Sequence, residues 1–186
     1  MARYVALLRS VNVAGHGRLV MGELRASFEQ LGCRDVATYL QSGNVVFSLT
    51  GRSEKGLVAA IEGQLAADFG ASPAVILRTG ADLARIAASS LFPAAGADPT
   101  RHHVTFLAAK PAASALAALD LPPSGRDALV VHGREVYVHT PDGYARTKYS
   151  GNFLERRLGV LGTTRNWNTV TNLGTLAARR GAGTDP

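Results

Sequence analysis

Short apolar runs alternate along this chain with amphipathic stretches. Residues 4–8 are a nearly continuous apolar run, which is typical of a strand covered on both faces. Apolar residues at helical spacing predict a helix over residues 21–31, which Gly32 ends. The same spacing after Ser53, a favourable N-cap residue, predicts a long helix that ends near Phe69. These are the first strand and the two helices of the first half.

A hairpin signal lies between these two helices. Residues 36–41 and 45–48 are rich in β-forming residues, and the segment Ser42–Asn44 between them suits a tight turn. In this register Leu40 shares a face of the hairpin with Phe47. We expect that face to pack against the two helices.

A fourth strand is predicted over residues 74–77, so the first half has the order βαββαβ. This order is the split-βαβ arrangement of a ferredoxin-like unit, in which the first and third strands are central. The second half partly repeats it, with a strand over 104–108, a weak helix over 112–119, hairpin strands over 127–132 and 135–140, and helices over 150–159 and 165–180. Gly133-Arg134 suits a type II′ turn between the hairpin strands.

A helix is predicted where the fourth strand of the second half is due. The expected fold class is therefore α+β: a ferredoxin-like βαββαβ half followed by a degenerate second ferredoxin-like half with extra C-terminal helices. The expected organisation is a first half (1–80), a short helix and connector (81–100), a second α+β half with C-terminal helices (101–180) and a loose tail (181–186).

Composition narrows the class of protein. At 46% hydrophobic and 18% charged residues, the chain has enough apolar material for a folded core. It lacks the roughly 18 consecutive apolar residues of a membrane helix, and residues 4–8 are too short for a secretion signal. We therefore expect a cytoplasmic protein with no membrane association. The lone Cys33 excludes an internal disulfide framework.

The net charge of +6 is unevenly distributed. Residues 1–100 have nine Lys/Arg against eight Asp/Glu, whereas residues 101–186 have eleven against six. An excess of this kind can mark a surface that attracts anions. It also fits solvated helix faces and arginines at a helix C-terminus, and this second interpretation is favoured.

Three polar runs lie at the ends of predicted elements: residues 9–18 after the first strand, 41–44 at the hairpin tip and 163–169 at the start of the last helix. Loops that enter helices expose backbone N–H groups, and arginine forks add affinity for carboxylate or phosphate. The candidate ligand-binding residues are Arg9, Asn12, Gln41, Ser42, Asn44, Lys148, Arg165, Asn166 and Asn168.

Three functions compete for these residues. The first is a cleft for a small anionic ligand, such as a phosphometabolite or nucleotide, at the junction of the two halves. The second is an interaction or structural module whose polar motifs are internal latches. The third, and least favoured, is weak nucleic-acid binding through the basic segment 144–180.

No pattern of catalytic residues is found in the sequence, so whether the protein is an enzyme stays open. No metal site is expected, because His102 and His103 are adjacent on a strand and point to opposite faces. The glycines of residues 15–17 do not complete a dinucleotide fingerprint or a P-loop, and no cofactor is expected.

The polar runs resemble the signature blocks of a bacterial family, the domain of unknown function 1697. The blocks are Arg9-x-x-Asn12-Val13-x-Gly15, Tyr39-x-Gln41-Ser42-Gly43-Asn44-Val45-Val46-Phe47 and Thr163-Thr164-Arg165-Asn166-Trp167-Asn168-Thr169-Val170. The segment Pro141-Asp142-Gly143-x-x-Arg146-x-Lys148 is similar to another part of that family, and Ala14 departs from it where a glycine is expected. The resemblance implies a pair of ferredoxin-like halves and no established activity.

Overall fold

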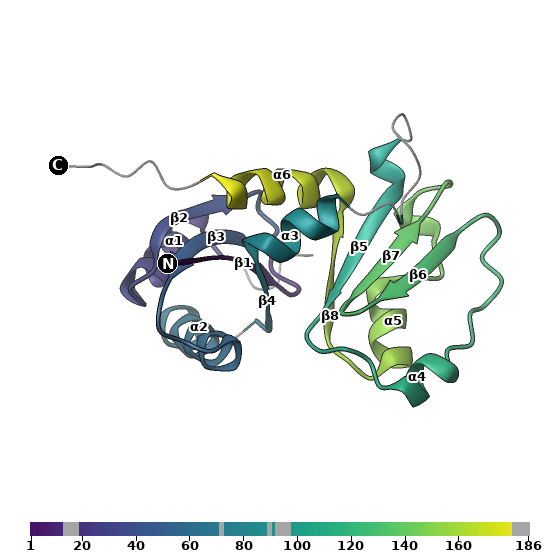
Figure 1. Cartoon of the computed structure of the whole chain (residues 1–186), viewed down its shortest axis with the longest axis horizontal. Helices are drawn as coiled ribbons and strands as arrows, with labels where there is room; N and C mark the ends of the chain where they lie inside the picture. The colour runs from purple at the N-terminus through teal and green to yellow at the C-terminus, as the bar shows by residue number, and fades with distance from the viewer. Residues whose placement is uncertain (13–18, 71–72, 89–90, 92–97, 180–186) are drawn as a thin grey trace. The chain divides into compact units, whose positions relative to one another are not determined.

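The computed structural model describes residues 1–12, 19–70, 73–88, 91 and 98–179 (Figure 1). The chain divides into two compact units, Met1–Ala87 with Asn172–Pro186, and Ala88–Thr171. The described residues form an α+β protein with one four-stranded antiparallel sheet in each unit and six α-helices. None of these helices is long and apolar enough to cross a membrane. Residues 181–186 of the predicted tail, and residues 89–90 and 92–97 of the predicted helix and connector, lie outside the described residues.

The first sheet has the strand order β2-β3-β1-β4. Its elements are β1 (Ala2–Leu8), α1 (Met21–Gln30), β2 (Arg34–Tyr39), β3 (Asn44–Leu49), α2 (Glu54–Phe69), β4 (Val75–Thr79) and α3 (Gly80–Ala87). The predicted elements of the first half are therefore present, and β1 and β3 are central. The predicted cap of α2 is confirmed, because the Ser53 side chain accepts a hydrogen bond from the Gly56 N–H at 3.2 Å.

Helices α1 and α2 cover one face of this sheet (Figure 1). Phe28 of α1 meets Phe47 of β3 edge to face, with ring centroids 5.1 Å apart. The α2 stripe of Leu57, Ile61 and Leu65 is fully buried beside them. The i, i+4, i+8 spacing read from the sequence therefore identifies the buried face of α2 correctly.

The prediction that Leu40 lies on this face is wrong. The β2–β3 pairing ends at Tyr39 and Asn44, so Leu40 lies in the connecting loop and not in the strand. Leu40 has φ +58 and its side chain is 55% exposed. The four-residue loop is longer than the predicted tight turn, and the alternation of faces does not extend into it.

The second sheet has the order β6-β7-β5-β8. Its elements are β5 (His102–Leu107), α4 (Ala113–Ala117), β6 (Ala128–His132), β7 (Glu135–His139), α5 (Gly151–Leu158) and β8 (Gly162–Asn166), and α6 (Trp167–Ala178) follows. The predicted absence of a fourth strand is wrong. Residues 162–166 pair with β5 along their whole length, and α6 begins only at Trp167. Thr163 and Thr164 are residues that can cap a helix, but β-branched residues also favour strands, and here the sheet contacts decide.

The β6–β7 hairpin has an unbroken register. Val131 lies opposite Val136, and Leu129 lies opposite Val138. Gly133 adopts φ +64 in the two-residue turn, as the first position of a type II′ turn requires. These apolar residues pack with Leu154 and Leu158 of α5 to form a separate core on one face of the second sheet.

Gly43 at the β2–β3 loop provides a test of how tightly this loop packs. It has φ +69, and an added Cβ would clash with Val11 Cγ2 and lie 2.8 Å from Leu8 Cβ. Gly51 has a similar φ of +82, but an added Cβ there has no neighbour within 4 Å. Both Gly→Ala changes incur the cost of a left-handed backbone, but only Gly43→Ala also overpacks the core, which costs about 1–3 kcal/mol.

We therefore expect Gly43→Ala to lower the free energy of unfolding, measured in urea, clearly more than Gly51→Ala does. Equal losses for the two variants would show that Val11 and Leu8 do not constrain the loop.

Candidate functional site

Asn12 closes the loop that follows β1. Its side-chain amide donates to Leu19 O at 3.2 Å, and its Oδ1 accepts from Leu19 N at 2.8 Å. The same amide donates to Gln41 O at 2.7 Å, which ties the loop to the β2–β3 loop. Asn12 has φ +53, a conformation that asparagine tolerates better than most residues. All three bonds are made to the backbone of its own unit, so Asn12 acts as an internal latch.

The hairpin tip is held in the same way. Asn44 is fully buried and donates to Tyr39 O at 2.8 Å and to Ser42 Oγ at 2.9 Å. The Leu8 N–H donates to Gly43 O at 2.8 Å, so the tip is bonded directly to the end of β1. The Gln41 side chain is exposed, and the backbone carbonyl of this residue is the group that Asn12 binds.

The third polar run lies on β8 and at the start of α6. Arg165 is buried, and its Nη1 donates to Thr163 Oγ1 at 2.7 Å and to Thr164 O at 2.9 Å. Asn166 Nδ2 donates to Thr100 O at 3.1 Å, and its Oδ1 caps α6 by accepting from Asn168 N at 3.0 Å. Because neighbouring strand residues point to opposite faces, the side chains of Arg165 and Asn166 diverge within this unit.

A buried arginine at the corresponding place in the first unit was not predicted. Arg78 on β4 is 1% exposed, and its Nη1 donates to Leu77 O at 2.8 Å. Arg78 and Arg165 therefore make the same bond, each to the carbonyl of the preceding residue on the fourth strand of its sheet. The only sequence signal for Arg78 is a charged residue inside the apolar strand Val75–Thr79.

The two units also contain an equivalent glutamate. Glu62 of α2 accepts a hydrogen bond from Val75 N at 2.9 Å, and Glu155 of α5 accepts one from Gly162 N at 2.6 Å. Val75 and Gly162 begin β4 and β8, the strands that also hold the two buried arginines. Each unit thus uses one arginine and one glutamate to satisfy backbone groups along an edge strand.

The segment before α5 forms a second polar cluster. The Tyr144 hydroxyl accepts from Gly151 N at 3.0 Å and bonds to Thr164 Oγ1 at 3.2 Å, and Thr164 Oγ1 lies 2.8 Å from Thr105 Oγ1. Lys148 Nζ donates to Pro123 O at 2.8 Å. The lysine proposed for ligand binding therefore holds the α4–β6 connection.

His103 is a buried residue that the sequence did not single out as functional. Its ring packs on Tyr144 with centroids 4.3 Å apart, and its Nδ1 has no hydrogen-bond partner among the described residues. Burial, with a smaller contribution from the charge of His102, lowers the pKa of His103 to about 4. His102 points to the other face and stacks on His139, as the alternation predicted.

The described residues contain no group of three His, Cys, Asp or Glu side chains able to hold a metal ion. Burial raises the pKa of Cys33 to about 11, so its thiol stays protonated at neutral pH and is a poor nucleophile. Among the candidate residues, the structure brings Asn12 to Gln41 and Ser42 to Asn44 in the first unit. In the second unit it brings Asn166 to the backbone of Asn168. The part of the first block over residues 13–18 lies outside the described residues.

Because burial lowers the pKa of His103, we expect the folded protein to lose stability in acid. Its pKa is 6.5 when unfolded and about 4 when folded, so between these pH values the unfolded chain binds the additional proton. Stability is fully present above pH 6.5 and falls as the pH decreases toward 4, by about 2 kcal/mol for this group.

Urea unfolding at pH 7 and pH 4.5 measures this loss. We expect His103→Phe, which keeps a planar ring against Tyr144, to lose less free energy between the two pH values than the wild type does. His132→Gln, at an exposed histidine of the β6 strand, should behave as the wild type. An identical loss in the His103 variant would exclude this histidine as the cause.

The chain is similar to known proteins both in sequence and in structure. The model of the family "Protein of unknown function (DUF1697)" matches residues 1–137. The conserved bacterial protein SP0830 from Streptococcus pneumoniae has a similar solved structure, with a TM-score of 0.72, 24% sequence identity, and coverage of 95% of this chain and 98% of that one. That likeness shows a shared fold, and no curated protein matches the sequence. The family match spans well over half of the chain, which therefore belongs to the DUF1697 family.

Proposed function

We propose that this protein is an interaction or structural module whose signature blocks are internal latches. The observation that carries the proposal is the use of the Asn12 side chain, which makes three hydrogen bonds to the backbone of its own unit. A side chain used in this way has little capacity left for a ligand. Asn44, Asn166 and Lys148 support the same interpretation, since each bonds to main-chain carbonyls nearby.

The repeated arginine supports a structural role for the third block. Arg165 was a candidate for binding an anion, but Arg78 makes the same bond in the other unit and belongs to no polar block. One structural requirement, the satisfaction of an edge strand, explains both arginines. Burial lowers the pKa of Arg165 only to about 10, so its guanidinium is charged at neutral pH.

We also infer that each unit has the ferredoxin-like arrangement. Both sheets follow the order in which the first and third strands of a βαββαβ unit are central and the fourth lies beside the first. A tandem pair of such units is a scaffold common to many unrelated functions, so the fold itself does not assign a reaction.

The Asn12 latch is tested with Asn12→Asp. Aspartate keeps the acceptor for Leu19 N and tolerates the left-handed backbone, but it loses both donors. We expect the free energy of unfolding to fall by about 1–3 kcal/mol because two carbonyl groups lose their partner. Gln41→Ala is the matched control in the same blocks. It removes an exposed side chain and should change stability by less than about 0.5 kcal/mol.

The same variants decide between a latch and an anion site, which stays a prediction from the sequence. Inorganic phosphate and ATP are added at low ionic strength while the melting temperature is measured. We expect no stabilisation of the wild type. A rise in melting temperature that Gln41→Ala or Asn12→Asp abolishes would favour the anion site and contradict the latch.

The arginine pair gives an independent test. Arg165→Ala and Arg78→Ala should each destabilise the protein by about 1–3 kcal/mol, because a buried carbonyl on the edge strand loses its donor. Arg156→Ala, at an exposed position of α5, is the control and should be nearly neutral. Arg165→Ala with normal stability would remove the structural explanation for the third block.

A further inference from the structure

The four edge strands of the two sheets differ in whether a structural feature hinders the pairing of another strand with them. β2 is interrupted by a bulge between Arg34 and Ala37, which disturbs its outer edge. On β4, Glu62 binds Val75 N, Arg78 binds Leu77 O and an Asp82 carboxylate oxygen binds Thr79 N. β8 has the corresponding Glu155 and Arg165 bonds. Each of these three edges has a feature that hinders the addition of another strand.

β6 has no such feature. It is the outermost strand of the second sheet (Figure 1), its register with β7 is unbroken, and its sequence Ala-Leu-Val-Val-His contains neither proline nor charge. Val130 at its centre is 44% exposed. A regular, apolar edge strand is a template for pairing with another strand.

The hydrogen-bond pattern shows which backbone groups β6 offers. In a two-residue hairpin the residues that flank the turn, His132 and Glu135, form a hydrogen-bonded pair. The pairing alternates along the strand, so Val130 and Ala128 also bond to β7. Leu129 and Val131 direct their N–H and C=O groups outward, and no hydrogen bond from either group to another described residue is found.

These outward groups are self-complementary. In an antiparallel pair of two β6 strands related by a two-fold axis at Val130, Leu129 of one copy lies opposite Val131 of the other. All four outward groups of each strand are then hydrogen-bonded. Shifting the axis to Leu129 or Val131 places one outward residue opposite Asp127 or Gly133, outside the strand. The register centred on Val130 is therefore the one that matches both strands completely.

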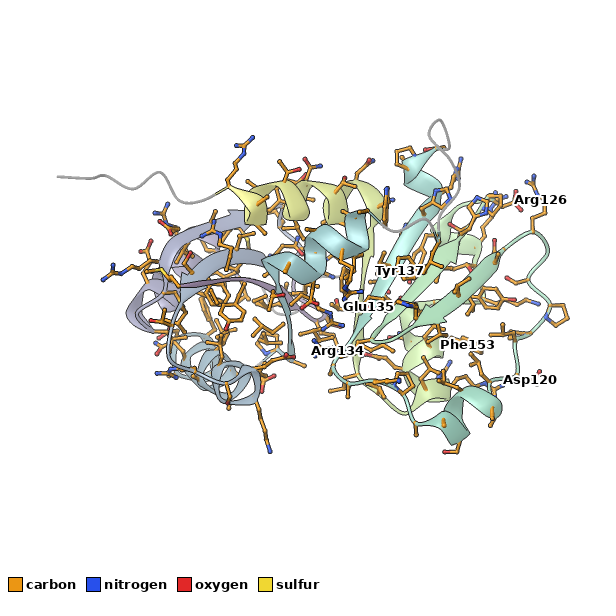
Figure 2. All side chains as sticks on the ribbon, viewed as in Figure 1. Asp120, Arg126, Arg134, Glu135, Tyr137 and Phe153 are labelled. Atoms are coloured by element: carbon orange, nitrogen blue, oxygen red, sulfur yellow. The ribbon has the colours of Figure 1, made fainter. Side chains whose placement is uncertain are left out.

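The side chains agree with this register. The two Val130 side chains meet at the axis on one face, where Val130 is now exposed, while Leu129 and Val131 continue the α5-covered core across the contact. Arg126 and Arg134 lie at opposite ends of β6 (Figure 2) and become neighbours across the pair. Arg126 already has an ion pair with Asp142, so Arg134 of the second copy meets a balanced pair and not a lone cation.

We propose that the chain self-associates through β6, as a two-fold dimer with one continuous eight-stranded antiparallel sheet centred on Val130. This proposal deepens the proposed interaction module by naming its partner, a second copy of the same chain. Failure to dimerise would overturn the dimer proposal but would leave the latch proposal unaffected, because the Asn12 and Arg165 variants test the latch separately.

Sedimentation velocity over tens to hundreds of micromolar tests the dimer. We expect a species of twice the 19.5 kDa chain mass in the wild type. Val130→Lys and Val130→Glu should each weaken the dimer at least tenfold, because like charges then meet at the axis. Mixing the two variants should restore a heterodimer through the opposite charges. Val20→Lys is the matched control, since Val20 is 52% exposed in the first unit, and it should leave the dimer intact.

The outcomes separate the alternatives. A monomeric wild type overturns the proposal, as does a dimer that Val130→Lys leaves unchanged, which would place the contact on another surface. Circular dichroism and the melting temperature show that the variants are folded, and because Val130 is half exposed, both should match the wild type. If both single variants are monomeric but their mixture does not re-form a dimer, the axis is not at Val130.

Discussion

Every sheet that does not close on itself ends in two strands whose outer N–H and C=O groups need partners, and this requirement organises much of the structure. In the first unit, Glu62, Arg78 and Asp82 supply those partners along β4. In the second, Glu155 and Arg165 do the same for β8. An unsatisfied backbone group in a buried place costs as much as a lost hydrogen bond. The buried charges follow from this cost, and they are not in themselves signs of chemistry.

The need to provide hydrogen-bond partners for backbone groups also changes how the signature blocks are interpreted. Blocks rich in Arg, Asn and Gly at the ends of elements are typical of ligand sites, because loops and helix starts expose donors. In this protein the donors of Asn12, Asn44 and Asn166 bond to backbone carbonyls of their own unit. Gly43 is needed because Val11 and Leu8 leave no room for a side chain. We therefore propose that the blocks hold loops in place, and that the β6 edge is the more promising functional surface.

Sequence patterns predicted the elements well where one signal dominated. The α2 stripe, the Ser53 cap and the Gly133-Arg134 turn were each set by local spacing or by a single residue. The prediction failed where two local signals competed. Thr163 and Thr164 suit both a helix cap and a strand, and Leu40 suits both a strand end and a loop. For Thr163 and Thr164, pairing with the distant strand β5 decides the outcome, and no local window contains that strand. For Leu40, the length of the β2–β3 loop decides the outcome.

The amino-acid sequence by itself therefore determined the α+β class of the fold and the positions of the polar blocks, because these depend on periodicity and on capping residues nearby. Only the tertiary structure decided that β8 is a strand, that Arg78 and Arg165 are equivalent, and that the His103 pKa falls to about 4. Those properties depend on which backbone groups and side chains meet across strands tens of residues apart. Burial and hydrogen-bond partners of that kind are set by packing, and packing is a property of the whole unit.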